Sequence, residues 1–124
     1  MICLDTNYLI RGVSEDSAEA GELVAWIEAG ERLITPMVAW FEFICGPVTA
    51  DQKATMGAFL ARIVPFAEAE AVEAARLFNA IQRKRSHRVD AMIAGTAITA
   101  KARLATNNRA DFKPFAAHGL QLLS

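Results

Sequence analysis

Four acidic residues stand in settings where acids are uncommon. Asp5 ends the apolar run Met-Ile-Cys-Leu, Glu42 interrupts an apolar segment, Asp90 opens another, and Asp111 follows a polar loop. Carboxylates are seldom buried unless they are paired or bind a metal. If the fold gathers them, they repel one another, and a divalent cation such as Mg²⁺ or Mn²⁺, which prefers oxygen ligands, relieves the repulsion. The pattern therefore predicts a metal-dependent acidic site.

Each acid also has a local structural explanation. Asp5 fits an Asx turn or a helix cap, Asp90 fits a helix N-cap, and Asp111 fits a turn cap. Glu42 would face solvent on an amphipathic helix, although its neighbours are nearly all apolar. Neutral polar residues that could orient a ligand or a phosphate lie beside the acids: Thr6, Asn7, Thr106 and Asn108.

Other site chemistries find little support in the sequence. His87 and His118 lack metal-ligand spacing, and we expect both in loops or at the surface. Cys3 and Cys45 lie among apolar residues and are expected to be small buried side chains. No Ser-His-Asp or Cys-His set and no glycine-rich phosphate loop is evident. Nucleophilic side-chain catalysis and nucleotide binding by a phosphate loop are therefore disfavoured.

Length and composition predict one domain that spans residues 1–124. No apolar run approaches the roughly 20 residues of a membrane-spanning helix, and no basic leader precedes the first apolar residues. We therefore expect a cytoplasmic protein that does not contact a membrane. Hydrophobic residues make up 53% of the chain, which indicates that a partner covers part of the surface.

The net charge of −1 hides an uneven distribution. Residues 14–31 are acidic without any lysine or arginine, whereas residues 76–113 are rich in both. A basic half can hold a polyanion locally, although basic helix ends and solvated faces explain the pattern equally well. The candidates for contacts with the phosphates of a polyanion such as RNA are Arg83, Lys84, Arg85, Arg88 and Arg109.

Strand and helix patterns alternate along the chain. Short strands are expected at 1–4, 32–35, 63–66, 104–106 and 120–123, with Pro65 favouring a sheet edge. Helices are expected at about 16–30, 36–46, 49–63, 68–84 and 90–102, the last rich in small residues that suit close packing. Residues 83–88 are expected to form a loop and 109–114 a loop or short helical turn.

This alternation predicts an α/β fold with three layers, α/β/α, around a short, mostly parallel central sheet. Binding crevices of such sheets lie outside the carboxyl ends of the strands. Asp5 follows the first strand, and Asn107, Asn108 and Asp111 follow the strand at 104–106. We therefore expect these residues at one edge of the sheet.

Four segments in order resemble the PIN domain, in particular the small VapC-type toxin ribonucleases of bacterial toxin–antitoxin pairs. The segments are Leu4-Asp5-Thr6-Asn7, residues 41–46 (FEFICG), residues 90–97 (DAMIAGTA) and residues 105–112 (ATNNRADF). Each motif alone is common, whereas the ordered set in so short a chain is specific. The resemblance covers essentially the whole chain.

The resemblance implies a Mg²⁺- or Mn²⁺-dependent endoribonuclease with one or two metal ions held by Asp5, Glu42 and Asp90. Many relatives carry an aspartate where this chain has Asn108, so we expect Asp111 as the fourth acid with Asn108 in support. It also implies products with 5′-phosphate and 3′-hydroxyl ends, with tRNA among the candidate substrates.

The same resemblance implies a homodimer and a VapB-type antitoxin that inserts a segment over the acids. An antitoxin arginine would suit that role, because it can pair with carboxylates in a bidentate manner. Four aromatic residues fit either an interface or the core: Trp26, Trp40, Phe43 and Phe59.

Two other functions remain open from the residues. A receiver-like signalling domain also carries acids at strand ends, but Asp5 stands alone at its strand end, and no lysine occupies a suitable place on the last strand. A PIN-like fold could also act only as a binding scaffold, although the full acid set argues against it.

Overall fold

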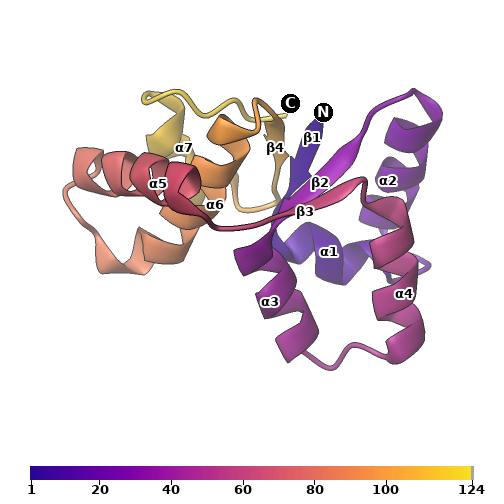
Figure 1. The fold of residues 1–124 in the computed structure, drawn as a ribbon. Coiled ribbons are helices and arrows are strands. Elements are labelled where there is room, and N and C mark those ends of the chain that lie inside the picture. The colour runs from indigo at the N-terminus through magenta and orange to yellow at the C-terminus, as the bar shows by residue number, and fades with distance from the viewer. Residues whose placement is uncertain (124) are drawn as a thin grey trace.

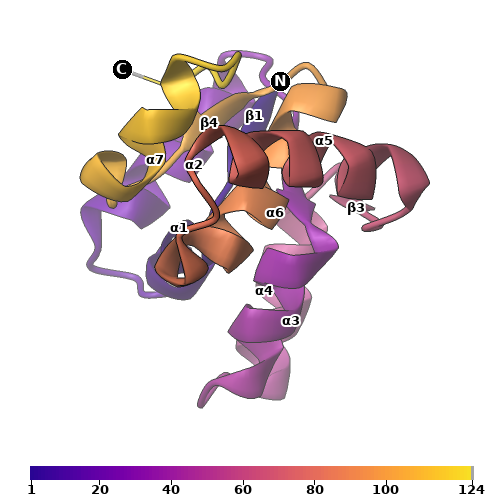
Figure 2. The same ribbon diagram turned by 90° about the vertical axis from the view of Figure 1, so that its left-hand side faces the viewer.

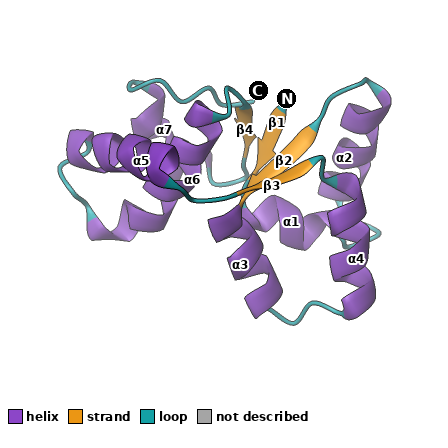
Figure 3. Ribbon diagram, viewed as in Figure 1, coloured by secondary structure: helices purple, strands orange, loops and turns teal. Residues whose placement is uncertain are grey.

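A computed structural model describes residues 1–123, and its centre is a four-stranded parallel sheet. The strands β1 (Ile2–Leu4), β2 (Leu33–Pro36), β3 (Arg62–Val64) and β4 (Arg103–Ala105) lie in the order β3-β2-β1-β4 (Figure 3). β3 is an edge strand and ends directly before Pro65, as the sequence predicted. All strands run in one direction, so their carboxyl ends form a single edge.

Helices cover both faces of this sheet. They are α1 (Thr6–Gly12), α2 (Ala18–Glu28), α3 (Met37–Cys45), α4 (Ala50–Phe59), α5 (Glu68–Ala80), α6 (Arg88–Thr99) and α7 (Arg109–Ala116). Figures 1 and 2 show α5, α6 and α7 on one side of the sheet and α1, α2 and α4 on the other, while α3 extends from its carboxyl end. The predicted three-layer α/β/α architecture is confirmed. None of the helices within residues 1–123 has the length and apolarity to cross a membrane.

Polar residues at the helix starts explain where several helices begin. The Ser17 hydroxyl accepts a hydrogen bond from the Ala20 amide and caps α2. Thr49 and Gln52 form a reciprocal capping box at the start of α4. These side chains accept amide hydrogen bonds that would otherwise lack partners in the first turn of each helix.

The core lies on both sides of β1 and β4, and its closest helix contact joins α5 to α6. Cys3 and Leu104 of the sheet are fully buried. At Gly95 in α6, an added Cβ atom would lie 2.7 Å from the Ala74 nitrogen and 2.9 Å from its Cα. Only glycine permits this approach, which confirms the close packing predicted for the small-residue helix.

The structure differs from the expected elements in three places. Thr6–Gly12 form α1, a helix that was not expected, and Asp5 caps it, which is one of the two local roles predicted for this residue. The segment 83–88 is not entirely a loop, since Arg85–His87 form a 3₁₀ turn and α6 already begins at Arg88. The predicted last strand at 120–123 forms only an isolated bridge between Leu122 and Leu104, so the sheet ends at β4.

Two side-chain expectations also need correction. Cys45, at the end of α3, is exposed rather than buried, because that end of the helix extends away from the sheet. Among the four aromatic residues, Phe43 is only 2% exposed and belongs to the core. Trp26, Trp40 and Phe59 are half-buried against the same core. The exposed aromatic side chain on α3 is Phe41, at 61%.

Candidate functional site

Asp5 is a buried acid where β1 meets α1. It caps α1, and its Oδ1 accepts a hydrogen bond from the Tyr8 amide at 3.1 Å. Its Oδ2 accepts a hydrogen bond from the Thr106 hydroxyl, which comes from the end of β4. Burial raises the pKa of Asp5 above its ordinary value and the charge of Asp90 adds to this, while the hydrogen bonds oppose it. Asp5 therefore caps α1, but the hydrogen bonds that it accepts do not cancel the rise in its pKa caused by burial.

Asp90 lies in the first turn of α6 and is half-buried. Burial raises its pKa, and the negative charges of Asp111 and Glu42 raise it further. The opposing influence comes from His87, whose Nδ1 lies 3.1 Å from Asp90 Oδ2. These effects show that the four predicted acids influence one another: Asp5 with Asp90, and Asp90 with Glu42 and Asp111.

His87 is a site residue whose contact with Asp90 the sequence analysis did not predict: it was expected in a loop or at the surface, and it ends the 3₁₀ turn Arg85–His87. Its side chain is only 17% exposed, and its ring packs edge-on against Phe115 at a centroid distance of 6.4 Å. The ring is therefore fixed on one side by an aromatic contact and on the other by Asp90. A histidine three residues before an aspartate at a helix start is the signal that could have indicated this pair.

Glu42 lies on the exposed face of α3, at the rim of the site. The Thr6 hydroxyl donates a hydrogen bond to its Oε1 at 2.6 Å. Thr6 belongs to the first turn of α1, directly after Asp5, so one short segment positions two of the acids. The contact shows that Thr6 holds Glu42, while the predicted role of Thr6 toward a bound ligand or phosphate stays a prediction.

The segment between β4 and α7 supplies the remaining polar groups. Thr106 is buried and, besides binding Asp5, accepts a hydrogen bond from the Asn108 amide at 2.9 Å. Asn108 occupies the N-cap position of α7 without forming a side-chain cap. Asp111 lies exposed in the first turn of α7, and it reaches the site through the influence of its charge on Asp90.

These residues surround a cleft of about 230 Å³ at the carboxyl edge of the sheet. Its lining consists of Asp5, Thr6, Asn7, Glu42, Val89, Asp90, Ile93, Asn108 and Phe112. Asn108 thus lines the cleft, whereas Asp111 does not. Phe112, one residue beyond Asp111, also lines the cleft, and its side chain is buried.

The chemistry of this donor set suits a hard divalent cation. Every charged donor is a carboxylate oxygen, and the pKa values of Asp5 and Asp90 are raised by burial first and by the charges of neighbouring acids second. As they stand, however, no three Asp, Glu, His or Cys side chains within residues 1–123 are grouped closely enough to hold a metal ion. The chemical type of these side chains suits a divalent cation, but their carboxylates would have to move closer together to bind it.

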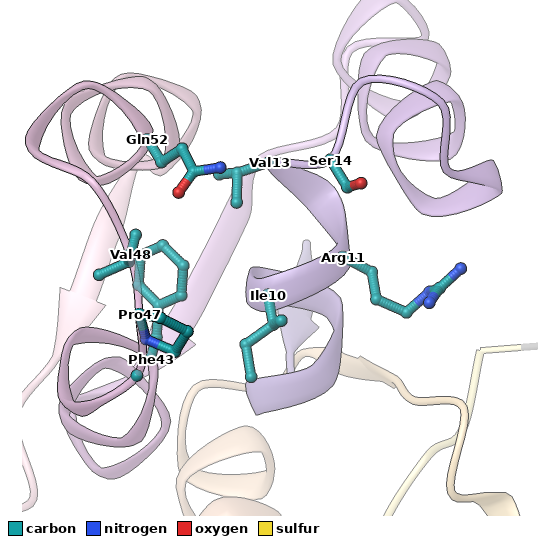
Figure 4. Close-up of a pocket in the computed structure, with 9 residues that line it drawn as sticks. Ile10, Arg11, Val13, Ser14, Phe43, Pro47, Val48 and Gln52 are labelled. Carbon is teal, nitrogen blue, oxygen red and sulfur yellow. The ribbon is translucent and has the colours of Figure 1, made fainter.

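A second hollow is separate from the acids and has a different lining. It is a groove of about 300 Å³ between α1 and the ends of α3 and α4, with Ile10, Phe43, Pro47 and Val48 facing one another (Figure 4). Arg11, also on its border, points away from these apolar side chains in Figure 4. No acidic residue lines the groove.

The predicted RNA-binding residues divide into two groups. Arg83 donates to the Asn79 side chain at 2.8 Å, and Arg109 donates to the Leu123 carbonyl at 2.5 Å. Within residues 1–123, the exposed side chains of Lys84, Arg85 and Arg88 form no hydrogen bond or ion pair. The three unpaired cations precede, along the chain, Val89 and Asp90 of the cleft lining.

Comparisons with known proteins agree with this arrangement. No curated protein sequence matches the chain. Similar solved structures include VapBC2 from Rickettsia felis bound to a fragment of its promoter DNA, with a TM-score of 0.74, 19% identity and coverage of 99% of this chain and 98% of the other. DNA-bound VapBC from Salmonella typhimurium also gives 0.74, at 20% identity and with 98% and 96% coverage.

FitAcB from Neisseria gonorrhoeae gives a TM-score of 0.68 at 23% identity and covers 99% of this chain and 97% of the other. At these identities the likeness shows a shared fold. The model of the PIN domain family matches residues 2–117. Because this match spans nearly the whole chain, it excludes the receiver-like alternative. The chain belongs to the PIN domain family.

Proposed function

We propose that this protein is a metal-dependent endoribonuclease that hydrolyses RNA phosphodiesters and acts as the toxin of a toxin–antitoxin pair. One observation carries the proposal: the acid that follows β1 and acids from α3, α6 and α7 interact at one edge of the sheet, where two of them have raised pKa values. A protein tolerates such unfavourable charge at a functional site more readily than elsewhere. Membership of the PIN domain family supports the same activity.

In this proposal Asp5 and Asp90 anchor the principal Mg²⁺ or Mn²⁺, and Glu42 completes the site from the rim. When bound, the ion would lower the pKa of a water molecule and stabilise negative charge on the phosphate. Thr6 orients Glu42, Thr106 orients Asp5, and His87 orients Asp90. Asn108 supplies a neutral amide to the cleft, and Asp111 adds negative charge from outside it.

The unpaired cations before α6 are the part of the proposal that concerns RNA. Lys84, Arg85 and Arg88 are exposed and lie just before Val89 and Asp90, which line the cleft, so their side chains are free to bind phosphates of an RNA bound there. Arg83 and Arg109 would first have to give up contacts within the chain. We therefore assign the main RNA contacts to the first three residues, with tRNA among the substrates to be tested.

The partners that we propose are a second copy of the chain and an antitoxin of the VapB type. The solved structures with a similar fold include toxin–antitoxin complexes, which supports the antitoxin. An antitoxin arginine could pair with the excess carboxylates of the cleft and block it. Exposed apolar residues beside the cleft, Met37, Phe41 and Val89, form a surface that suits the second copy.

The decisive experiment is a cleavage assay with purified protein on total RNA and on tRNA. We expect cleavage with Mn²⁺ or Mg²⁺, none with EDTA, and none with Asp5→Asn or Asp90→Asn. Glu31→Gln, an acid-to-amide change at the opposite end of the sheet, serves as the matched control and should cleave normally. Cleavage that persists in EDTA, or in both cleft variants, would refute the metal-dependent mechanism.

The assay also separates the enzyme from the scaffold alternative. A folded wild-type protein that binds RNA or an antitoxin peptide but cleaves nothing with either metal would favour the scaffold. The ends of any products provide a further check, because the proposal expects a 5′-phosphate and a 3′-hydroxyl.

A further inference from the structure

Glu19 is a buried acid outside the cleft. Within residues 1–123, Asp5 and Glu19 are the charged residues in the buried class, and Glu19 is 8% exposed. It lies in the first turn of α2, a helix that supplies nothing to the cleft lining. A buried carboxylate needs partners, so the groups that bind it show what it holds in place.

Both oxygens of the Glu19 carboxylate are engaged, each by a different part of the chain. Arg11 Nε of α1 donates to Oε1 at 3.0 Å, and Asn107 Nδ2 donates to Oε2 at 2.8 Å. The direction of Arg11, away from the apolar groove in Figure 4, is consistent with this contact. One side chain therefore ties α1, α2 and the segment after β4 together.

Asn107 is the middle residue of the segment that borders the cleft. Before it, Thr106 binds Asp5, and after it, the Asn108 amide binds Thr106. The Asn107 side chain does not line the cleft and instead donates a hydrogen bond to Glu19. Since adjacent Cα atoms are about 3.8 Å apart across a planar peptide, fixing Asn107 restricts the position of Asn108.

The Asn108 backbone is held locally, by its amide hydrogen bond to Thr106 and by the Asp111 and Phe112 amides that donate to its carbonyl, whereas its side chain has no hydrogen-bond partner within residues 1–123. It stands at the N-cap position of α7, yet its side chain makes no capping hydrogen bond and lines the cleft. Asp111, three residues later in the same first turn, depends on the same segment for its position. A displacement of Asn107 would therefore move both the amide and the acid that this segment contributes.

We propose that Glu19 is a positioning residue of the candidate site: acting through Asn107, it holds Asn108 and the start of α7 against the acidic cleft. The inference rests on the proposed metal-dependent function, which it deepens by adding a residue 88 positions away in sequence from its partner. A purely structural alternative is that Glu19 only joins α1 to α2 through Arg11.

Three variants distinguish these roles. Glu19→Ala removes both contacts, Asn107→Ala removes the contact to the cleft segment, and Arg11→Met removes the other contact while leaving Glu19 and Asn107 in place. Outer partners of metal ligands typically change affinity or activity by about 10- to 100-fold. We expect Glu19→Ala and Asn107→Ala each to weaken Mn²⁺ binding about 10-fold, and the double variant to lose no more than either single one.

Mn²⁺ binding is measured directly, by the electron paramagnetic resonance signal of the free ion, and cleavage is measured as separate kcat and KM values. The ¹H–¹⁵N spectrum without metal reports on the Asn108 amide, which should shift in Glu19→Ala and Asn107→Ala much more than in Arg11→Met. Thermal melts record any loss of stability in all three variants.

Two results would overturn the proposal. One is wild-type Mn²⁺ affinity and kcat in Glu19→Ala and Asn107→Ala with only a lower Tm. The other is an equal loss of Mn²⁺ binding in Arg11→Met, which would trace the effect to the α1–α2 contact. A wild-type protein that neither binds Mn²⁺ nor cleaves RNA would overturn the proposed function itself, and with it this inference.

Discussion

Carboxylates at the two ends of the parallel sheet have pKa values that are shifted in opposite directions. At the amino end, Glu31 accepts hydrogen bonds from the Met1 ammonium group at 2.9 Å and from the Arg103 guanidinium, which lower its pKa. At the carboxyl end, Asp5 and Asp90 are partly or fully buried near other acids, and their pKa values are raised. Carboxylates thus stabilise one end of the fold and cost stability at the other, where the cleft lies.

The largest expected difference between the two ends is in catalysis. Glu42→Gln removes one acid of the cleft while keeping its shape, and we expect cleavage to fall by at least about 100-fold, the upper end of the loss caused by removing an outer partner of a metal ligand. Glu31→Gln makes the same chemical change at the amino end and should leave kcat unaltered. Single-turnover cleavage of one defined RNA measures both variants. Equal losses in the two would mean that overall charge, rather than the cleft, governs the reaction.

The next difference concerns the cations beside the cleft. We expect the double variant Arg85→Ala/Arg88→Ala to bind RNA about 10-fold more weakly at physiological salt. The slope of log affinity against log salt should also fall by about 1.4, since each phosphate contact with a single strand contributes about 0.7. Arg32→Ala/Lys101→Ala, which removes two exposed cations just before β2 and β4, is the control. Filter binding at several salt concentrations would contradict the assignment if the control changed the slope as much.

The buried charge of Asp5 in the cleft should also lower the stability of the folded protein. A folded-state pKa above the ordinary value means that ionisation opposes folding, so the destabilisation develops as the pH rises from 3.8 through the raised pKa of Asp5. Asp5→Asn keeps an N-cap acceptor but removes the charge, and at pH 7 without metal it should be more stable by about 1 kcal/mol. Thermal melts in EDTA should show this gain, and it should vanish at pH values below 3.8. A loss of stability at pH 7 would show that the hydrogen bond from Thr106 outweighs the charge.

The smallest effect is expected at the amino end, with the opposite sign. The pKa of Glu31 is lowered from its ordinary value of 4.5, so its contribution is present above that pH and is lost as the pH falls through the folded-state pKa. Glu31→Gln should therefore lower Tm at pH 7 and converge with the wild type in acid. Melts across this pH range test the prediction. If the two curves stayed parallel at every pH, the contacts of Glu31 would not depend on its charge.

The fold and the position of Asp5 could be predicted because they depend on local patterns and on one topological rule. Short apolar runs that alternate with helices require a parallel sheet, and the carboxyl ends of its strands must share an edge. That rule brought Asp5 and Asn108 together from opposite ends of the chain. It does not determine side-chain direction in α7, so it could not show that Asn108 lines the cleft and Asp111 does not. The choice of Asp111 as the fourth acid, with Asn108 in support, came from the family resemblance.

Other features depend on contacts that no local pattern reveals. The chain leaves α5 through Gln82 and Arg83, both in the left-handed region with φ values of 64° and 58°. Such a turn is typical of glycine, so these residue types gave no sign that His87 would be brought onto Asp90. Glu19 is similar, because a charged residue in the first turn of a helix usually faces solvent. Glu19 is buried here, and its partner Asn107 follows β4, a strand that begins 84 residues after Glu19.

Gly95 shows how a residue can be indispensable without taking part in chemistry. The backbone of Ala74 already occupies the space that any side chain at position 95 would need, so even Gly95→Ala must push α5 away from α6. Because α6 also carries Asp90, that displacement would reach the cleft one and a half turns away. In a screen for variants that have lost the proposed nuclease activity, position 95 would therefore score like a catalytic residue, and only a measurement of folding would reveal the difference.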